Sequence, residues 1–453
     1  MKYYLAIDIG ASSGRHILGS IDRGKLALEE VYRFPNGLKE RDGHIVWDVQ
    51  ELFGEIIAGM KKCADIGKIP VSLGIDTWAV DYVLLDADGR GIPPAYAYRD
   101  RRGSESVAAV EKIIPFAELY SRTGIQKQPF NTIYQLWWDK ERGRLGQASG
   151  MLMLPEYFNY LLTGKAVREY TNSTSTGLIN ACTGTWDREI ISAMAYPERL
   201  FDEIHQPGDF VGGLLPEIRR EAGFDCAVVL PGTHDTASAV AACPGADGHA
   251  LYISSGTWSL MGTELDLAML DGRCMAANFT NEGGVNGKIR FLKNIMGLWM
   301  IQQIKHEQKE AVSYEHLMNM AQSSEFAGTV DVQSGDFLAP RSMLETVRAK
   351  LGRPELPLAD VMRSVYHSLA LCYAQTAREI EQITGREYGK IYIFGGGCSD
   401  GYLNELTELY SRKRVVAGPK EATAIGNILV QLLAGGEIRS IQEGRRLARE
   451  SCV

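Results

Sequence analysis

Near the middle of the 453-residue chain lies the stretch Pro231-Gly232-Thr233-His234-Asp235-Thr236-Ala237-Ser238-Ala239-Val240. The apolar run at residues 227–230 predicts a buried strand, and Pro231-Gly232 ends it. The small residues that follow favour the start of a helix. Asp235 is therefore expected at a strand-to-helix turn, where the helix N-terminus favours negative charge. This position suits a carboxylate that stays ionised and accepts a proton.

The chain before this stretch begins with a predicted β-hairpin. The strands of this part of the chain are expected at residues 3–7, 15–20, 25–32 and 71–75. Residues 8–14 form the tight turn between the first two strands. Asp48, with Glu51 three residues later, is typical of a helix N-cap. Three strands, a helix and a fourth strand in this order indicate a mixed-sheet α/β domain.

The chain after residue 248 repeats this order. A strand at 251–253 leads to a turn and return strand at 254–260, then to a helix over 361–373 and a strand at 390–394. Ser254-Ser255-Gly256 falls in register with Ser12-Ser13-Gly14. We interpret this as an internal duplication of one α/β unit. The predicted domains are residues 1–243 and 244–453, which meet in a Pro/Gly-rich linker over 243–248.

Three turns carry the small residues that phosphate binding requires. In the first hairpin, Gly10, Ser12, Ser13 and Gly14 allow backbone N–H groups to face a phosphate, and Asp8 could hold Mg²⁺ directly or through water. Residues 254–257 supply a second such loop. Residues 394–397 are Phe-Gly-Gly-Gly between a strand and a helix. Each turn alone is also compatible with an ordinary structural turn, but two hairpins of this kind in tandem halves favour phosphate binding.

Composition excludes several classes of protein. A formal charge of −8, 45% hydrophobic and 23% charged residues indicate a globular protein that does not act on nucleic acid or an anionic membrane. The cysteines are scattered, with no C-x-x-C pair, so we expect reduced thiols and a cytoplasmic location. No run is apolar enough for a membrane span, and the first residues lack a signal-peptide core. No G-x-x-x-x-G-K-[ST] motif or Cys/His zinc cluster is present.

The chain resembles the FGGY family of carbohydrate kinases, within the actin/hexokinase-like ATPase superfamily. The matching residues are 11–15, 74–78, 80–82, 98–100, 234–240, 254–259, 292–295, 297–299 and 394–397. Arg15 after Ser-Ser-Gly and His234 before Asp235 are similar to the rhamnulokinase branch of that family. The resemblance implies two tandem ribonuclease H-like domains with a cleft between them. It also implies ATP and L-rhamnulose as substrates, with Mg²⁺ as cofactor.

The same resemblance implies residue roles. Asp235 would be the catalytic base. The sugar would contact Ala79, His234, Asp235, Thr236 and Asn294. ATP would contact Ala11, Ser12, Ser13, Gly14, Arg15, Thr257, Gln302 and Gly396. At residue 79 the rhamnulokinase branch carries a sugar-binding glycine, whereas this chain has Ala79. A sugar contact made by the main chain would survive this change, but a contact that needs a glycine-only conformation would not.

Asp235 is expected to orient the primary hydroxyl of the sugar and take its proton, with an ordinary pKa of about 3.9. Trp78 is expected to face the sugar, and the basic cluster Arg99, Arg101 and Arg102 is either a solvated loop or a substrate contact. Two alternatives stay open. One is a kinase for L-fuculose or another ketose of the same family, and the other is a catalytically silent protein that binds sugar or nucleotide.

Overall fold

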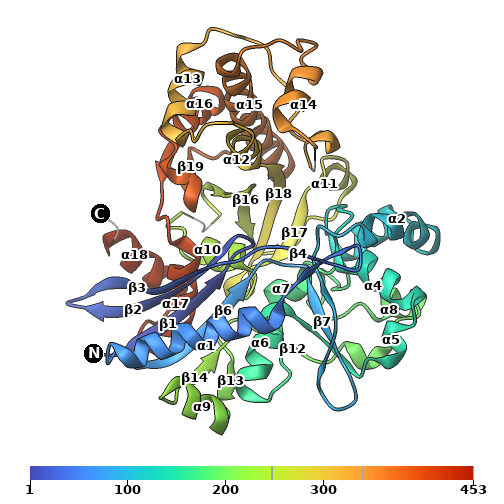
Figure 1. Cartoon of the computed structure of the whole chain (residues 1–453), viewed down its shortest axis with the longest axis vertical. Helices are drawn as coiled ribbons and strands as arrows, with labels where there is room; N and C mark the ends of the chain where they lie inside the picture. The colour runs from blue at the N-terminus through green and yellow to red at the C-terminus, as the bar shows by residue number, and fades with distance from the viewer. Residues whose placement is uncertain (246–247, 339, 452–453) are drawn as a thin grey trace. The chain divides into compact units, whose positions relative to one another are not determined.

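Two six-stranded mixed sheets form the framework of this α/β chain (Figure 1). The computed structural model describes residues 1–245, 248–338 and 340–451. The chain folds into two compact units, each assembled from segments that are not continuous in sequence. Unit 1 comprises Met1–Pro244, Glu264–Phe291 and Thr423–Val453, and unit 2 comprises Gly245–Thr263 and Leu292–Ala422. Ala246 and Asp247, within the predicted linker, lie outside the described residues.

The first sheet lies in unit 1 and has the order β13-β14-β6-β1-β2-β3. Its strands are β1 (Tyr3–Ile9), β2 (Ser13–Asp22), β3 (Lys25–Pro35), β6 (Pro70–Thr77), β13 (Phe210–Gly213) and β14 (Ala227–Val229). β1 is antiparallel to β2 and parallel to β6. The register sets Asp8 opposite both Arg15 and Asp76, so three charged side chains meet at one end of the sheet.

Helices cover both faces of this sheet. On one face α1 (Val49–Asp65), α6 (Leu154–Thr163) and α9 (Pro216–Ala222) share a core with the strands. The predicted N-cap of α1 is confirmed, because the Asp48 side chain accepts a hydrogen bond from the N–H of Glu51. On the other face is α17 (Ala422–Ala434), whose Asn427 amide donates to the carbonyl of Gly74 at 3.0 Å.

A second apolar cluster of unit 1 is built mainly from short helices after β6. Its elements are β7 (Tyr82–Leu85), β8 (Gly91–Ile92), α2 (Arg102–Ile113), α3 (Phe116–Thr123), α4 (Thr132–Glu141), α5 (Arg144–Gln147), β10 (Gly150–Met153), α7 (Tyr170–Thr174), α8 (Arg188–Ala193), η1 (Glu198–Leu200) and β12 (Ile204–His205). The other elements of the unit are β4 (Lys39–Arg41), β5 (His44–Trp47), β9 (Ala95–Tyr96), β11 (Arg168–Glu169), α10 (Asp235–Ala241), α11 (Gly272–Ala276), β17 (Thr280–Gly283), η2 (Val285–Gly287) and α18 (Ile441–Ser451).

The second sheet has the order β17-β18-β16-β15-β19-β20. Its remaining strands are β15 (Leu251–Ser255), β16 (Trp258–Leu265), β18 (Ile289–Met296), β19 (Lys390–Phe394) and β20 (Arg414–Ala417). β15 is antiparallel to β16 and parallel to β19, as β1 is to β2 and β6, so the predicted duplication is confirmed at the level of strand order. β16 and β18 run through the boundary between the units, after Thr263 and Phe291.

The predicted match of the two Ser-Ser-Gly sequences is wrong in detail. Ser254 and Ser255 end strand β15, whereas Ser12 lies in the turn and Ser13 begins β2. The second hairpin turn is therefore only Gly256–Thr257, one residue shorter than the turn of residues 10–12. A shared tripeptide does not fix the register of a hairpin, because turn length sets it.

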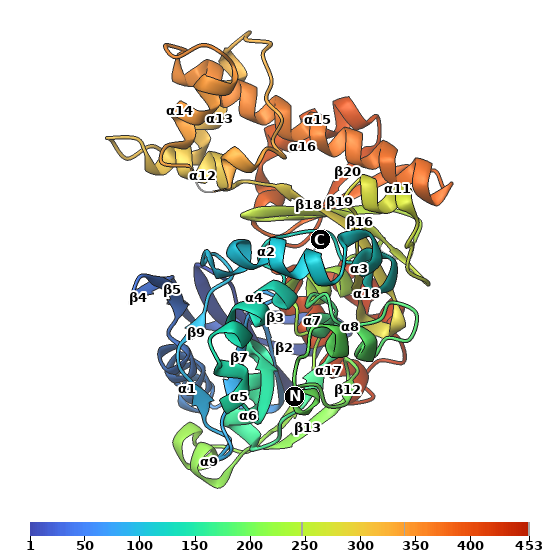
Figure 2. The ribbon, with the colours of Figure 1, turned by 90° about the vertical axis from the view of Figure 1, so that its right-hand side faces the viewer.

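The rest of unit 2 is helical (Figure 2). Its elements are α12 (Trp299–His306), α13 (Tyr314–Ser323), η3 (Gly335–Phe337), α14 (Met343–Lys350), α15 (Leu358–Thr384), η4 (Gly396–Ser399) and α16 (Gly401–Ser411). The long helix α15 contacts both α13 and α16. Among residues 1–245, 248–338 and 340–451, no helix has the length and apolarity that crossing a membrane requires.

Candidate active site

Asp235 lies at the predicted strand-to-helix turn. β14 ends at Val229, His234 is the N-cap of α10, and Asp235 is its first residue. The turn is attached to the first sheet because the N–H of Thr77, the last residue of β6, donates to the carbonyl of Thr233 at 3.0 Å. Asp235 is thus presented at the same end of the sheet as Asp8.

A buried carboxylate, Glu169, holds the loop that precedes Asp235. It accepts hydrogen bonds from the hydroxyl and N–H of Thr233, at 2.5 and 3.3 Å, and from the N–H of Thr171 at 2.8 Å. The Thr171 hydroxyl in turn accepts the N–H of His234 at 3.3 Å. No sequence motif pointed to Glu169, which is separated from Thr233 by 64 residues.

Helix α10 is fixed further along its length by C-terminal segments of unit 1. A Cβ at Gly426 of α17 would lie 1.7 Å from the carbonyl oxygen of Ser238, so the two helices approach as only glycine allows. The buried Arg445 of α18 donates to the carbonyls of Ala241 and Val240, at 3.1 and 3.3 Å. The carbonyl of Val240 also accepts the N–H of Cys243 at 3.0 Å, so Arg445 adds a second donor there at the C-terminal end of the helix.

The electrostatics of Asp235 differ from expectation. Its side chain is 31% exposed, and Oδ1 accepts the N–H and hydroxyl of Thr236 at 2.5 and 3.1 Å. Loss of bulk hydration, followed by repulsion from the Asp8 carboxylate, raises the pKa of Asp235 to about 7. The ordinary pKa predicted from the sequence is therefore wrong, because that prediction left out the burial of Asp235 and the neighbouring Asp8 carboxylate.

Asp76 is a third carboxylate here, which sequence reasoning did not select. It is fully buried on β6; its Oδ2 accepts the Asn427 amide at 2.5 Å, and its Oδ1 has no hydrogen-bond partner. Burial, then the negative charges of Asp8 and Asp235, raises the pKa of Asp76 well above its usual range. The signal available in the sequence was its position at the end of a strand that pairs with β1.

The cluster formed by the carboxylates of Asp8, Asp76 and Asp235 fits a hard cation only in part. Oxygen donors suit Mg²⁺, and the unpartnered Oδ1 of Asp76 and the mutual repulsion of the group favour a positive charge nearby. Both Nε and Nη2 of Arg15 donate to Oδ2 of Asp8, at 2.9 and 2.7 Å. Within the described residues, no three His, Cys, Asp or Glu side chains form a complete metal site. A Mg²⁺ ion would thus need waters and substrate phosphates as further ligands.

The first hairpin is open to solvent at its tip, with Ala11 and Ser12 exposed. Asn36, which sequence reasoning missed, closes the turn: its N–H donates to the Ser12 carbonyl at 3.0 Å and its amide to the Gly10 carbonyl at 2.8 Å. Gly14 is buried, and a Cβ there would lie 2.1 Å from Cζ of Phe34. The glycine is thus required for packing, whatever ligand the turn binds.

Ala79 lies in a loop after β6 that does not need glycine at this position. Among the described non-glycine residues, Val80 has a left-handed backbone conformation (φ 70°), but Ala79 does not. Trp78 is only 7% exposed; its ring lies 4.1 Å from that of Trp47, and its Nε1 donates to Asp81 at 2.9 Å. Trp78 is therefore part of the core and supports Asp81 from the inside.

Four predicted contacts lie in unit 2. Thr257 is bonded to the start of α12, because its carbonyl accepts the N–H of Trp299 at 3.1 Å. Gln302 lies in the first turn of α12, and its N–H donates to the carbonyl of Leu298 at 2.8 Å. Gly396 is exposed beside Gly395, whose φ of 83° requires glycine. Asn294 is half-buried on β18. The other predicted site residues all belong to unit 1.

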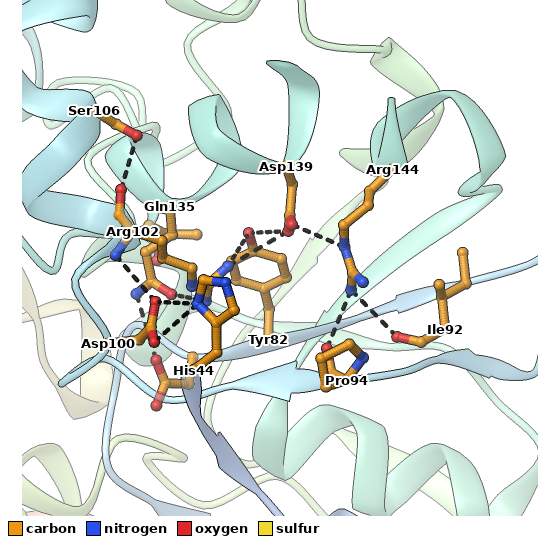
Figure 3. Close-up of polar contacts among 12 residues, drawn as sticks. His44, Tyr82, Ile92, Pro94, Asp100, Arg102, Ser106, Gln135, Asp139 and Arg144 are labelled. Atoms are coloured by element: carbon orange, nitrogen blue, oxygen red, sulfur yellow. Dashed lines mark hydrogen bonds and ion pairs between the residues drawn. The ribbon is translucent and has the colours of Figure 1, made fainter. Parts of the chain in front are cut away.

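The Arg99–Arg102 cluster is not a uniform solvated loop. Arg102 is buried, and Figure 3 shows it directed toward Asp139 from one side while Arg144 approaches from the other. The guanidinium groups lie 3.5 and 2.8 Å from the carboxylate, and the hydroxyl of Tyr82 donates to it at 2.7 Å. Arg102 therefore neutralises a buried charge, a role that its exposed-looking sequence context did not indicate.

Family models match both halves of the chain. The N-terminal domain of the FGGY family of carbohydrate kinases matches residues 3–242, and the C-terminal domain of that family matches residues 251–435. The chain belongs to the FGGY family of carbohydrate kinases. The fold of this carbohydrate kinase, predicted from the sequence as a two-domain α/β fold, is confirmed.

Individual relatives cover the whole kinase. A rhamnulokinase of Halalkalibacterium halodurans is 45% identical over 100% of this chain and 97% of its own length. A rhamnulokinase of Bacillus subtilis is 41% identical over 99% and 93%. Among solved structures, a ligand-bound xylulose kinase of Lactobacillus acidophilus superimposes with a TM-score of 0.81 at 18% identity, over 99% of this chain and 92% of that one. A Plasmodium falciparum glycerol kinase with ADP gives a TM-score of 0.78 at 14% identity, over 99% and 92%.

Proposed function

We propose that this kinase transfers the γ-phosphoryl group of ATP to the primary hydroxyl of L-rhamnulose, forming L-rhamnulose 1-phosphate in L-rhamnose catabolism. The observation that carries the proposal is full-length identity of 38–45% to several rhamnulokinases. The identity extends over both halves of the chain. It therefore includes the segments with the proposed sugar contacts and those with the proposed ATP contacts.

Asp235 acts as the general base in this proposal. Its carboxylate accepts the proton of the attacking hydroxyl while the new P–O bond forms, a role worth on the order of 10²–10⁴-fold in rate. An upward-shifted pKa of about 7 supports the assignment, because a base is most effective when its pKa lies near the working pH. Ala79, His234, Thr236 and Asn294 are the proposed sugar contacts.

The hairpin residues Ala11, Ser12, Ser13, Gly14 and Arg15, with Thr257, Gln302 and Gly396, are the proposed ATP contacts. Asp8 is the proposed Mg²⁺ ligand, directly or through water. When bound, Mg²⁺ neutralises charge on the transferring phosphoryl group. The exposure of Ala11 and Ser12 supports a phosphate contact, since small residues let backbone N–H groups approach a ligand.

Two further predictions from the sequence remain proposals. We retain a division into a sugar-binding domain over residues 1–243 and a nucleotide-binding domain over 244–453. A cytoplasmic location is consistent with the cysteines, since those the structure describes in residues 63–398 are free thiols.

The test is ADP release from ATP with a panel of L-rhamnulose, L-fuculose, D-xylulose, D-ribulose and glycerol. We expect the highest kcat/KM for L-rhamnulose, with the phosphate on the primary hydroxyl of the product. A higher kcat/KM for another ketose would reject the substrate. ADP release that no sugar on the panel stimulates would reject the whole proposal.

A further inference from the structure

Behind His234 lies a buried charged pair that no step above uses. Arg290, at the start of β18, is completely buried, and its Nη2 lies 3.1 Å from a carboxylate oxygen of Glu282 on β17. Its Nε donates to the carbonyl of Gly283 at 2.8 Å, which fixes the direction of the guanidinium. The same Nη2 lies 3.0 Å from Nδ1 of His234. All these residues belong to unit 1.

The contact between Arg290 and His234 determines where the imidazole carries its proton. A guanidinium has only donors and stays charged, so Nδ1 must contribute its lone pair to this hydrogen bond. A neutral imidazole that accepts at Nδ1 carries its proton at Nε2. Burial and the charge of Arg290 hold the pKa of His234 well below its usual range, so the ring stays neutral.

The proton-bearing Nε2 faces the reaction centre. It lies 3.5 Å from Oδ1 of Asp235, and 9% of the His234 side chain is exposed. We propose that Arg290 is a positioning residue that holds His234 in the Nε2–H tautomer, so that His234 donates a hydrogen bond to an oxygen of the sugar beside Asp235. This inference rests on the proposed sugar kinase activity for the identity of the acceptor, but the tautomer itself does not depend on it.

Two consequences follow for the chemistry. His234 cannot take the proton of the attacking hydroxyl, because Arg290 engages its only lone pair; this leaves Asp235 as the acceptor. Glu282 is the competing partner, since its Oε2 lies 3.4 Å from Nδ1 and would accept a proton-bearing Nδ1. Without Arg290, an ionised Glu282 would draw the proton to Nδ1 and turn the lone pair of Nε2 toward the sugar, which loses its donor. Burial raises the pKa of Glu282, so this exchange requires a pH at which Glu282 is ionised.

The tautomer can be read directly by ¹⁵N NMR of the full-length protein labelled on histidine, without sugar or nucleotide. The chain has eight histidines, and loss of one signal set in His234→Asn assigns His234. We expect an unprotonated Nδ1 and a protonated Nε2 near neutral pH. The opposite tautomer, or a doubly protonated ring, would overturn the inference even if the enzyme phosphorylates L-rhamnulose.

Variants separate positioning from general stability. At a pH above the raised pKa of Glu282, Arg290→Met should shift the His234 signals to the Nδ1–H tautomer. It should also raise KM for the ketose about tenfold, the loss of one hydrogen bond, with a smaller change in kcat. Arg290→Lys keeps a cation with donors only and should keep the tautomer. Glu282→Gln removes the competitor and should also leave the tautomer unchanged.

Each outcome decides between these assignments. An unchanged tautomer in folded Arg290→Met would reject the role of Arg290. If Arg290→Met does not fold, the wild-type and Arg290→Lys spectra decide, and a changed tautomer in Arg290→Lys counts against the inference. Absence of ketose phosphorylation by a wild-type enzyme with the expected tautomer would reject the proposed function and leave the tautomer assignment standing.

Discussion

Gly14 provides a quantitative test of how the first hairpin is built. A methyl group at this position would lie 2.1 Å from Cζ of Phe34 and 2.5 and 2.6 Å from its Cε1 and Cε2. The ring cannot move away freely, because Phe34 is 2% exposed and contacts the rings of both His16 and Tyr32, each with its centroid 6.1 Å away. Gly14→Ala should therefore lower the free energy of unfolding by about 1–3 kcal/mol, the usual cost of overpacking.

Phe34→Leu is the matched background, because leucine lacks the three ring atoms that the new methyl group would meet. In this background Gly14→Ala should cost much less, so the double-mutant cycle should give a favourable coupling of about 1 kcal/mol or more. Urea unfolding of the four proteins, compared at equal slope, measures these differences. An equal loss in both backgrounds would refute the packing argument and would mean that Gly14 is required for another reason.

Three further perturbations test other parts of the account. Gly426→Ala should cost on the order of 3 kcal/mol, seen as a lower urea midpoint, because its Cβ would overlap the backbone of Ser238; an unchanged midpoint would contradict the close helix contact. Burial raises the pKa of Glu156 to about 8, above its unfolded value of about 4.5. Between these two pH values the unfolded chain releases this proton and the folded protein keeps it, so the free energy of unfolding falls by about 1.4 kcal/mol for each pH unit. The free energy of unfolding of Glu156→Gln relative to that of wild type should therefore increase from about pH 5.5 to about pH 7.5. A difference that stays constant over this range would contradict the raised pKa. For Asp235, whose pKa is raised to about 7, kcat/KM should fall about tenfold per pH unit below that value, whereas a flat profile down to about pH 5.5 would contradict it.

Local patterns predicted the elements that position the site. Apolar runs, turn residues and a capping pattern are sufficient to locate β1, β6, α1 and the turn before Asp235, because each depends on residues close in sequence. The repeated order of strands also indicated the duplication. These features established where Asp8 and Asp235 lie.

The surroundings of those residues were not predictable in the same way. Glu169 and Arg290 reach the site from segments far apart in the chain, and nothing local distinguishes them from other buried or surface charges. Asp76 lies near the end of a predicted strand, but its place beside Asp8 comes from the pairing of β6 with β1. The pKa of Asp235 depends on Asp8 and on burial, so the tertiary structure is needed to obtain it. Arg102 looked exposed in sequence because its buried partner, Asp139, lies on another helix.

The central claim is that Asp235 is the base of a ketose kinase. Its most direct test is kcat for L-rhamnulose with MgATP in Asp235→Asn, with sugar affinity measured separately by calorimetry. Asp88→Asn, a 67% exposed aspartate in a surface hairpin, is the matched control. The account predicts that kcat of Asp235→Asn falls by about 10²–10⁴-fold while the sugar still binds and the control keeps wild-type kcat. A folded Asp235→Asn enzyme with the kcat of wild type would contradict it.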